Sequence, residues 1–220
     1  MANNTGSIDD IRKKFHATHE LITTSYHESG HIIYGLLHNM NIGSVLVFAD
    51  KKSKRIHGLA YYDPPDLGKI QDYDLFIDRL HAEIGLSYAG FVAEMRYFKM
   101  ISGLDKLPFF IKEGSSNDFS EASALFKKYN LMPPGKKRYA YKQKLIKQVD
   151  KELLDNWDAV VLVSHALVKK KKLSFDELKL LLIKKSKNKE FWKKQFIMHH
   201  ALYFNSESID ENNMKYILSL

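Results

Sequence analysis

The stretch from Thr23 to His38 reads TTSYHESGHIIYGLLH and decides what fold can be built around it. Apolar side chains recur there at three- and four-residue spacings: Tyr26, Ile33, Tyr34 and Leu37. Hydroxyl residues at the start of such a run are typical of helix N-termini. The stretch therefore predicts a helix that begins near Thr23, with an apolar face turned toward a core.

The same helix carries the pentad His27-Glu28-Ser29-Gly30-His31, which is an H-E-x-x-H pattern. Two histidines four residues apart project from one helix face, so both imidazoles can bind one tetrahedral metal ion. The carboxylate of Glu28 lies beside that face, where it can hold and deprotonate a water molecule. The pattern predicts a zinc site of the kind found in metallopeptidases.

Two protein ligands do not complete a catalytic zinc site, which usually has three. The longer pattern H-E-x-x-H-x-x-G-x-x-H is not met, because Tyr34 replaces its glycine and Leu37 its third histidine. Chemistry alone leaves two candidates for the third ligand. They are Asp118, at a predicted helix start, and Glu94, on a predicted central helix.

The rest of the chain predicts a predominantly helical α+β domain. Strands are expected over residues 45–48 and 56–62, forming an antiparallel hairpin. Helices are expected over residues 72–101, 119–129, 142–169 and 174–185, and the last opens with a capping box. The expected fold class is a helix bearing the H-E-x-x-H motif, a small β-hairpin or sheet, and a C-terminal helical bundle.

Composition excludes several classes of protein. The chain has 220 residues, of which 45% are hydrophobic, so it can fill a domain core and is not a disordered tail. It has no cysteine, which excludes disulfides, thiolate nucleophiles and cysteine-ligated metals. The sequence shows neither an apolar run long enough to span a membrane nor a secretory leader pattern, so we expect a cytoplasmic protein.

Positive charge is concentrated in the second half of the chain. The net charge is +8, yet residues 127–194 hold 20 Lys and Arg against 7 Asp and Glu. These lysines alternate with apolar residues, as on the solvated face of a helix. We therefore do not expect nucleic-acid binding.

Three segments resemble the peptidase domain of the FtsH family of zinc proteases. They are the pentad His27–His31, the segment Ala89-Gly90-Phe91-Val92-Ala93-Glu94, and Ser116-Asn117-Asp118-Phe119, and they occur in the family's order. The resemblance covers about residues 21–185. It divides the chain into a polar lead-in (1–20), a peptidase domain (21–185) and a C-terminal extension packed on that domain (186–220).

The resemblance also implies roles for site residues. His27, His31 and Asp118 would be the metal ligands, which favours Asp118 over Glu94 as the third. Glu28 would be the catalytic carboxylate, and Glu94 would support the ligands or the fold. A tyrosine stabilising the oxyanion is also expected, but the sequence does not choose among Tyr26, Tyr34, Tyr61 and the other tyrosines.

The expected function is that of a zinc-dependent endopeptidase that hydrolyses peptide bonds. The chain lacks the phosphate-binding loop G-x-x-x-x-G-K-[ST], so it is expected to act without ATP or to receive substrate from a separate ATPase partner. Because FtsH peptidase domains form rings, the resemblance also implies a homo-oligomer. The alternative is a catalytically silent zinc-binding adaptor that uses the same fold to bind another protein.

Overall fold

The computed structural model describes residues 8–53, 55–64, 66–103, 115–131 and 135–203, with the side chains of residues 8–17 left out. In chain order the elements are α1 (Ile8–Leu37), β1 (Asn41–Ala49), β2 (Ile56–Asp63), the short 3-10 helix η1 (Leu67–Lys69), α2 (Tyr73–Ser102), α4 (Ser116–Lys128), α5 (Lys136–Asp155), α6 (Trp157–Lys170), β3 (Lys172–Leu173), α7 (Phe175–Lys185) and α8 (Lys189–Tyr203). The prediction of a predominantly helical α+β fold with a small antiparallel sheet is confirmed. Residues 1–7 of the predicted lead-in and 204–220 of the predicted extension lie outside the described residues.

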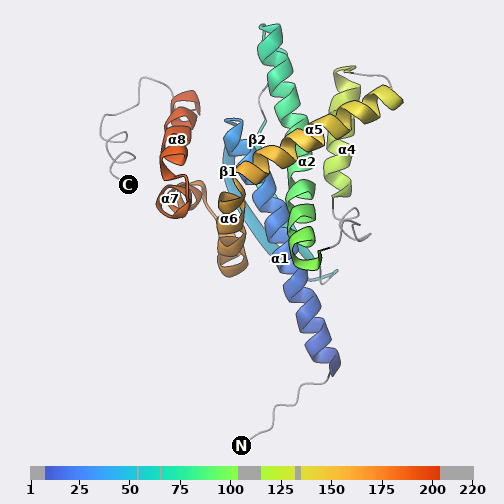
Figure 1. Cartoon of the computed structure of the whole chain (residues 1–220), viewed down its shortest axis with the longest axis vertical. Helices are drawn as coiled ribbons and strands as arrows, with labels where there is room; N and C mark the ends of the chain where they lie inside the picture. Colours follow the sequence, from blue (N-terminus) through green and yellow to red (C-terminus); the bar gives the residue numbers. More distant parts are fainter. Residues whose placement is uncertain (1–7, 54, 65, 104–114, 132–134, 204–220) are drawn as a thin grey trace, which may run out of the picture.

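Helices α1 and α2 run side by side through the centre of the molecule (Figure 1). Helices α4 and α5 pack on α2, whereas α6 packs on α1 and α7 packs on α8. The two central helices approach closely at Gly30, where a Cβ atom would meet the backbone of Ala89. Small residues at this crossing therefore bring the motif helix within reach of α2.

Helix α1 is longer than the sequence predicted, because it begins at Ile8 and not near Thr23. The hydroxyl residues expected to start it lie in its middle. Thr23 Oγ1 donates to the carbonyl of Glu20 at 3.0 Å, and Ser25 Oγ donates to that of Leu21 at 2.7 Å. Bonded to the preceding turn in this way, the hydroxyls do not compete with the helix.

The predicted hairpin is confirmed, and a two-residue strand extends it to the order β2-β1-β3, with both pairings antiparallel. A bulge lies between Ile42 and Val45 on β1. These residues pair with Tyr62 and Ala60 of β2, so β1 has one more residue than β2 in this interval. An extra residue reverses the alternation of side chains. As a result Ile42 and Val45, an odd number of residues apart, both face the core.

The single helix predicted over residues 142–169 is wrong, because α5 ends at Asp155 and α6 begins at Trp157. Asn156 leaves the helical conformation, with φ −119° and ψ 24°, and its side chain donates to the carbonyl of Glu152. The apolar spacing continues across the break, so the pattern could not reveal it. Helix α8 and strand β3 were not predicted.

Two apolar clusters hold the elements together. The larger lies around α1 and includes buried residues of β1, α6, α7 and α8, among them Ile33, Val45, Val163, Leu182 and Trp192. The smaller joins α2, α4 and α5 through Leu80, Ile84, Phe126 and Leu145, among others. Helix α4 is thus attached to α2 independently of the site described below.

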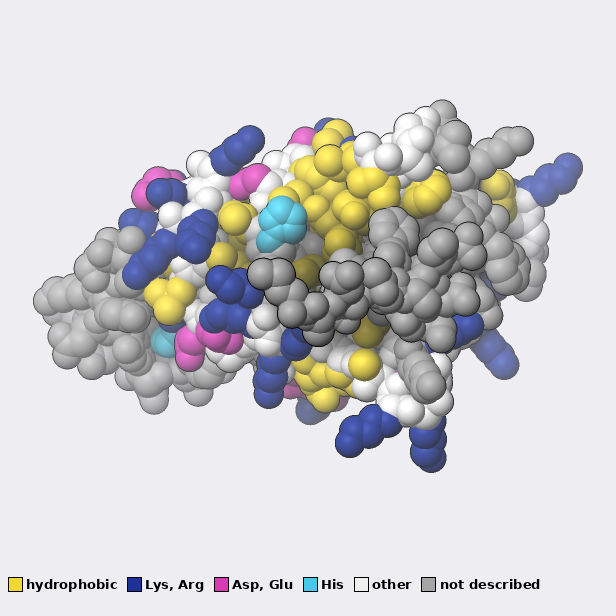
Figure 2. Space-filling model, turned by 90° about the horizontal axis from the view of Figure 1, so that it is seen from below, with side chains coloured by type: hydrophobic (Ala, Val, Ile, Leu, Met, Phe, Trp, Pro, Cys, Tyr) yellow, Lys and Arg dark blue, Asp and Glu magenta, His cyan; other side chains and the backbone are white. Residues whose placement is uncertain are grey.

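Lys and Arg side chains project from the face of the molecule seen in Figure 2. On the face in Figure 2, Lys and Arg side chains stand among acidic, apolar and polar ones. None of the helices in the described part of the chain combines the length and apolar content needed to cross a bilayer.

Candidate metal centre

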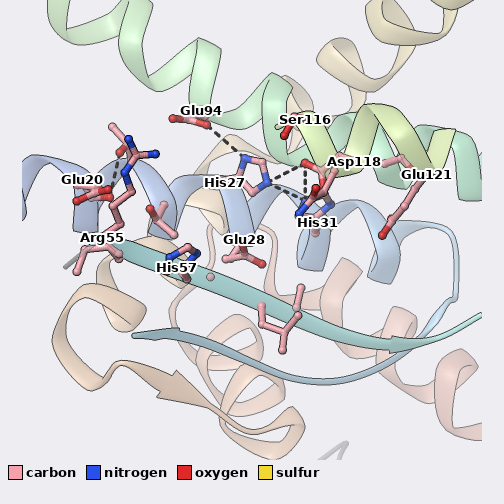
Figure 3. Close-up of a pocket in the computed structure, with 18 of the residues that line it drawn as sticks. Glu20, His27, Glu28, His31, Arg55, His57, Glu94, Ser116, Asp118 and Glu121 are labelled. Atoms are coloured by element: carbon pink, nitrogen blue, oxygen red, sulfur yellow. Dashed lines mark hydrogen bonds and ion pairs between the residues drawn. The ribbon is translucent and has the colours of Figure 1, made fainter. Parts of the chain in front are cut away.

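A cleft of about 730 Å³ lies between α1, α2, α4 and strand β2. Helix α1 supplies His27, Glu28 and His31 to it, α2 supplies Glu94, and α4 supplies Asp118 (Figure 3). Asp118 is in the first turn of α4, as the sequence indicated. The structure thus brings together all five site residues that the sequence predicted.

The two histidines and Asp118 converge on one point. Nε2 of His27 and Nε2 of His31 are 3.1 Å apart, and Asp118 Oδ2 lies 3.0 Å from the first and 3.7 Å from the second. Neighbouring ligands of a tetrahedral zinc ion are about 3.3 Å apart, since each bond is about 2.0–2.1 Å long. The three separations bracket this value.

Each imidazole is oriented by a hydrogen bond at Nδ1, the ring nitrogen that points away from Asp118. Nδ1 of His27 is 3.3 Å from Glu94 Oε2, and Nδ1 of His31 is 2.9 Å from the carbonyl of Leu86. Both partners are acceptors, so each neutral imidazole carries its proton on Nδ1 and directs a lone pair from Nε2 toward Asp118. With both imidazoles neutral, two lone pairs and a carboxylate face one another, an arrangement that a cation between them would stabilise.

Asp118 Oδ2 provides a second sign that a cation belongs here. This atom is buried and makes no hydrogen bond of acceptable geometry despite its short distance to His27. Buried carboxylate oxygens are rarely left without a partner. The donor set of two imidazole nitrogens and one carboxylate suits zinc, and the group His27, His31 and Asp118 can hold a metal ion.

The local charges shift two pKa values in opposite directions. Burial alone would lower the pKa of His27, but the carboxylates of Asp118 and Glu94 raise it well above its ordinary value. Burial alone would raise the pKa of Asp118, but His27 and His31 hold it well below its usual range. Both shifts arise because the two imidazoles and the carboxylate lie in direct contact.

Gly90 makes room for this arrangement. A Cβ atom at position 90 would overlap Nε2 of both His27 and His31, being closer to each than a van der Waals contact allows. The two imidazoles therefore occupy the space above the backbone of α2 that a side chain would fill.

Glu28 points away from the ligands toward strand β2 (Figure 3). It is only 6% exposed, and its carboxylate accepts a hydrogen bond from the backbone N–H of Ala60. Burial raises the pKa of Glu28, while the two histidines and the Ala60 N–H oppose that rise. A desolvated carboxylate beside a metal position has the proton affinity that a general base needs.

Strand β2 borders the cleft with an edge that no strand of the described chain pairs with. Its other edge is bonded to β1, and residues 55–60 together with Tyr62 line the cleft. A free edge presents unpaired N–H and C=O groups to an extended peptide. Gly58 on this strand leaves space that the carboxylate of Glu28 occupies.

The sequence did not identify which tyrosine faces the site. None of Tyr26, Tyr34 and Tyr61 lines the cleft: Tyr26 stacks on Tyr97, Tyr34 is buried against Gly85, and Tyr61 is 50% exposed. Tyr62 is the tyrosine in the lining. The bulge in β1 changes the pairing register opposite residues 60–62. The alternation of residues in the sequence therefore could not show which side chains of this part of the hairpin face the cleft.

Glu121 was also missed. It lies one turn after Asp118 on α4 and lines the cleft beyond His31. The signal that could have found it was its spacing of three residues from a predicted ligand, which puts both on one helix face.

Comparison of the sequence with models of known protein families gives no match, and comparison with curated proteins gives none either. The functional argument therefore depends on the geometry of this site.

Proposed function

We propose that this protein is a zinc metallopeptidase with an FtsH-like, zincin-type arrangement, which hydrolyses peptide bonds of extended substrates. The observation that carries the proposal is the convergence of Asp118 from α4 on the two imidazoles of the H-E-x-x-H helix, with Glu28 buried beside them. A purely structural zinc site usually has four protein ligands and needs no base.

Each site residue has a separate role in the proposed hydrolysis. A zinc ion held by His27, His31 and Asp118 would supply a Lewis acid at the scissile carbonyl. Glu28 accepts the proton of the attacking water and returns it to the leaving amine. Glu94 holds His27 in the orientation that ligation requires.

The free edge of β2 orients the substrate. A peptide adding to this edge as an antiparallel strand runs past Ala60, whose N–H now bonds Glu28, and so passes beside the ligands. The sequence contains no G-x-x-x-x-G-K-[ST] loop. The substrate is accordingly an already unfolded segment, reaching the cleft by itself or from a separate ATPase.

Metal content is the first test. Protein purified without chelator should contain about one zinc per chain by elemental analysis, and His31→Ala and Asp118→Ala should lose it. His57→Ala is the matched control, because His57 lines the same cleft but is not one of the converging groups. Wild-type protein that neither contains zinc nor takes it up would overturn the proposal.

Hydrolysis is the second test. Glu28→Gln should keep zinc yet lose cleavage of an unfolded protein such as casein by a factor of about 10² or more, since removal of a general base costs this much. Zinc-loaded wild-type protein that cleaves no peptide in a broad library would favour the catalytically silent adaptor.

A further inference from the structure

The cleft has two ends of different character. At one end its lining includes Glu20, Arg55 and His57 (Figure 3). At the other end, beyond His31, lies Glu121 (Figure 3), and the lining residue Tyr62 is near enough to be influenced by its charge; we call this the acidic end. Arg55 is the sole Lys or Arg among the described lining residues, and it lies at the first end.

Negative charge accumulates around Tyr62 at the acidic end. Burial and the nearby carboxylates of Glu121, Glu83 and Asp118 raise the pKa of Tyr62 to about 12. Burial and the neighbouring Asp118 likewise raise the pKa of Glu121, with only His31 opposing them. A metal ion would compensate Asp118, but it leaves the charges of Glu121 and Glu83.

Glu83 adds a second carboxylate close to the acidic end. It is only 8% exposed, and its buried Oε1 has no hydrogen-bond partner. It does not line the cleft itself, but it lies one helical turn before Ser87, which does. Lys128 faces it from α4, but this lysine is fully solvent-exposed and interacts mainly with Tyr129.

The acidic end also has an aromatic wall. Tyr62 lines it together with Glu121, whereas the side chain of Leu86 packs in the core and only its backbone carbonyl faces His31. Lysine and arginine side chains combine a hydrocarbon stem with a charged head, and they pack the stem on apolar surface while the head meets an acceptor. The lining therefore matches the chemistry of a long basic side chain.

We propose that the acidic end binds a lysine or arginine side chain of the substrate, with Glu121 as the specificity-determining residue. This inference rests on the proposed function, because it places the bound side chain next to the scissile bond. Glu121 receives the charged head, and Glu83 adds to the negative potential from behind.

Cleavage-site mapping tests the preference. A peptide library is digested and the cut sites are identified by mass spectrometry. Lysine and arginine should be enriched at one fixed position relative to the cut, by about two- to fivefold over neutral residues, as expected for an ion pair with a solvent-accessible carboxylate. Glu121→Gln should remove the enrichment, and Glu121→Lys should shift it toward aspartate and glutamate.

Glu190→Gln is the matched control, because it removes a carboxylate from the exposed surface of α8, far along the chain from the cleft. It should keep the wild-type preference. Cleavage by wild-type protein without enrichment of basic residues, or enrichment unchanged in Glu121→Gln, would overturn the inference.

Binding separates this inference from the proposed function. Zinc-loaded Glu28→Gln protein is titrated into two pools of fluorescein-labelled random peptides, one with lysine and one with glutamate as the only charged residue. Tighter binding of the lysine pool, lost on adding Glu121→Gln, supports the acidic end even if the wild type cleaves nothing. Equal binding of the two pools contradicts it, whatever the outcome of the hydrolysis test.

Discussion

Gly90 illustrates how one residue without a side chain can determine a ligand geometry. The imidazoles of His27 and His31 lie against the α2 backbone at this position, in space that a Cβ atom would fill. The ligand atoms are therefore placed by helix packing as much as by the pentad itself. Catalytic and metal sites depend on such supporting contacts to within a fraction of an ångström.

Gly90→Ala should weaken zinc binding by about ten- to a hundredfold, the range typical of changes behind the ligands. The added methyl group displaces Nε2 of both histidines, while α2 gains helix propensity at that position. Chelator competition measures the affinity. Gly43→Ala is the control, because a Cβ atom there would lie 3.6 Å from the carbonyl oxygen of Tyr61, an ordinary contact distance. An unchanged affinity in Gly90→Ala would contradict the prediction.

At the scale of elements, helix α8 completes the C-terminal end of the motif helix. Gln195 Nε2 donates to the carbonyl of Leu36 at 2.6 Å and to Asn39 Oδ1 at 2.9 Å. His199 Nε2 bonds the carbonyl of Met40 at 3.0 Å, and Tyr203 donates to that of Asn39 at 2.7 Å. The last carbonyls of a helix have no partner within it, so α8 adds donors at this end beside the N–H of Asn39, which also bonds the carbonyl of Leu36.

Gln195→Ala should lower the free energy of unfolding by about 1–2 kcal/mol, because the carbonyl of Leu37 and Asn39 Oδ1 lose their donor, while the carbonyl of Leu36 keeps the N–H of Asn39. Urea denaturation followed by circular dichroism measures the change. Gln143→Ala, at an exposed position on α5, should change stability little. Equal stability of the two variants would show that α8 does not stabilise this end of α1.

The contact of α1 with α5 is polar and titratable. Nε2 of His38 lies 2.7 Å from Glu152 Oε2, and Gln148 donates to the other oxygen of Glu152 at 2.9 Å. Burial would raise the pKa of Glu152, but the bonds from His38 and Gln148 outweigh it and lower that pKa below its usual value. The folded state therefore favours the ionised carboxylate.

Glu152→Gln should cost about 1 kcal/mol of stability at pH 7. A group whose pKa is lowered by folding contributes stability above its unfolded pKa, near 4.3 for glutamate, and loses it as the pH falls through the folded value. The difference between wild type and variant should thus persist at pH 6 and shrink below about pH 4. Urea midpoints at these pH values measure it, and a difference that grows on acidification would contradict the assignment.

For the whole molecule, the proposed zinc ion connects α1 to α4, which are far apart in sequence. Apart from this site, α4 is held by the smaller apolar cluster through Ala122 and Phe126. Ligands that bind only the folded state stabilise it by mass action, by about 2.7 kcal/mol at a hundred times the dissociation constant. The site is therefore expected to contribute to stability as well as to chemistry.

Chelation should lower the melting temperature by roughly 5 °C or more, and should increase amide exchange in α4 more than in α6. Differential scanning fluorimetry and hydrogen exchange measure the two effects. His31→Ala, which should bind no zinc, serves as control and should not respond to the chelator. An equal response from that variant would point to a different metal or to chelator binding.

The sequence by itself determined the local features of this protein. The pentad, the hairpin strands, the long α2 helix and the capping box at Ser174 follow from spacing and residue type, which act within a few turns of chain. The same spacing failed at Asn156, where one residue redirects a helix while the apolar period continues. It also failed at the start of α1, where hydroxyl groups bond within the helix.

Only the tertiary structure decided the site as a whole. That Asp118 meets the two imidazoles while Glu94 lies behind His27 depends on how α2 and α4 pack on α1, and residue spacing left these two carboxylates undecided. The roles of Gly90, Tyr62 and Glu121 are likewise set by helix crossing and by the bulge in β1. Ligand geometry is a property of distances between elements, and such distances follow from the packing of the whole core and not from any one segment.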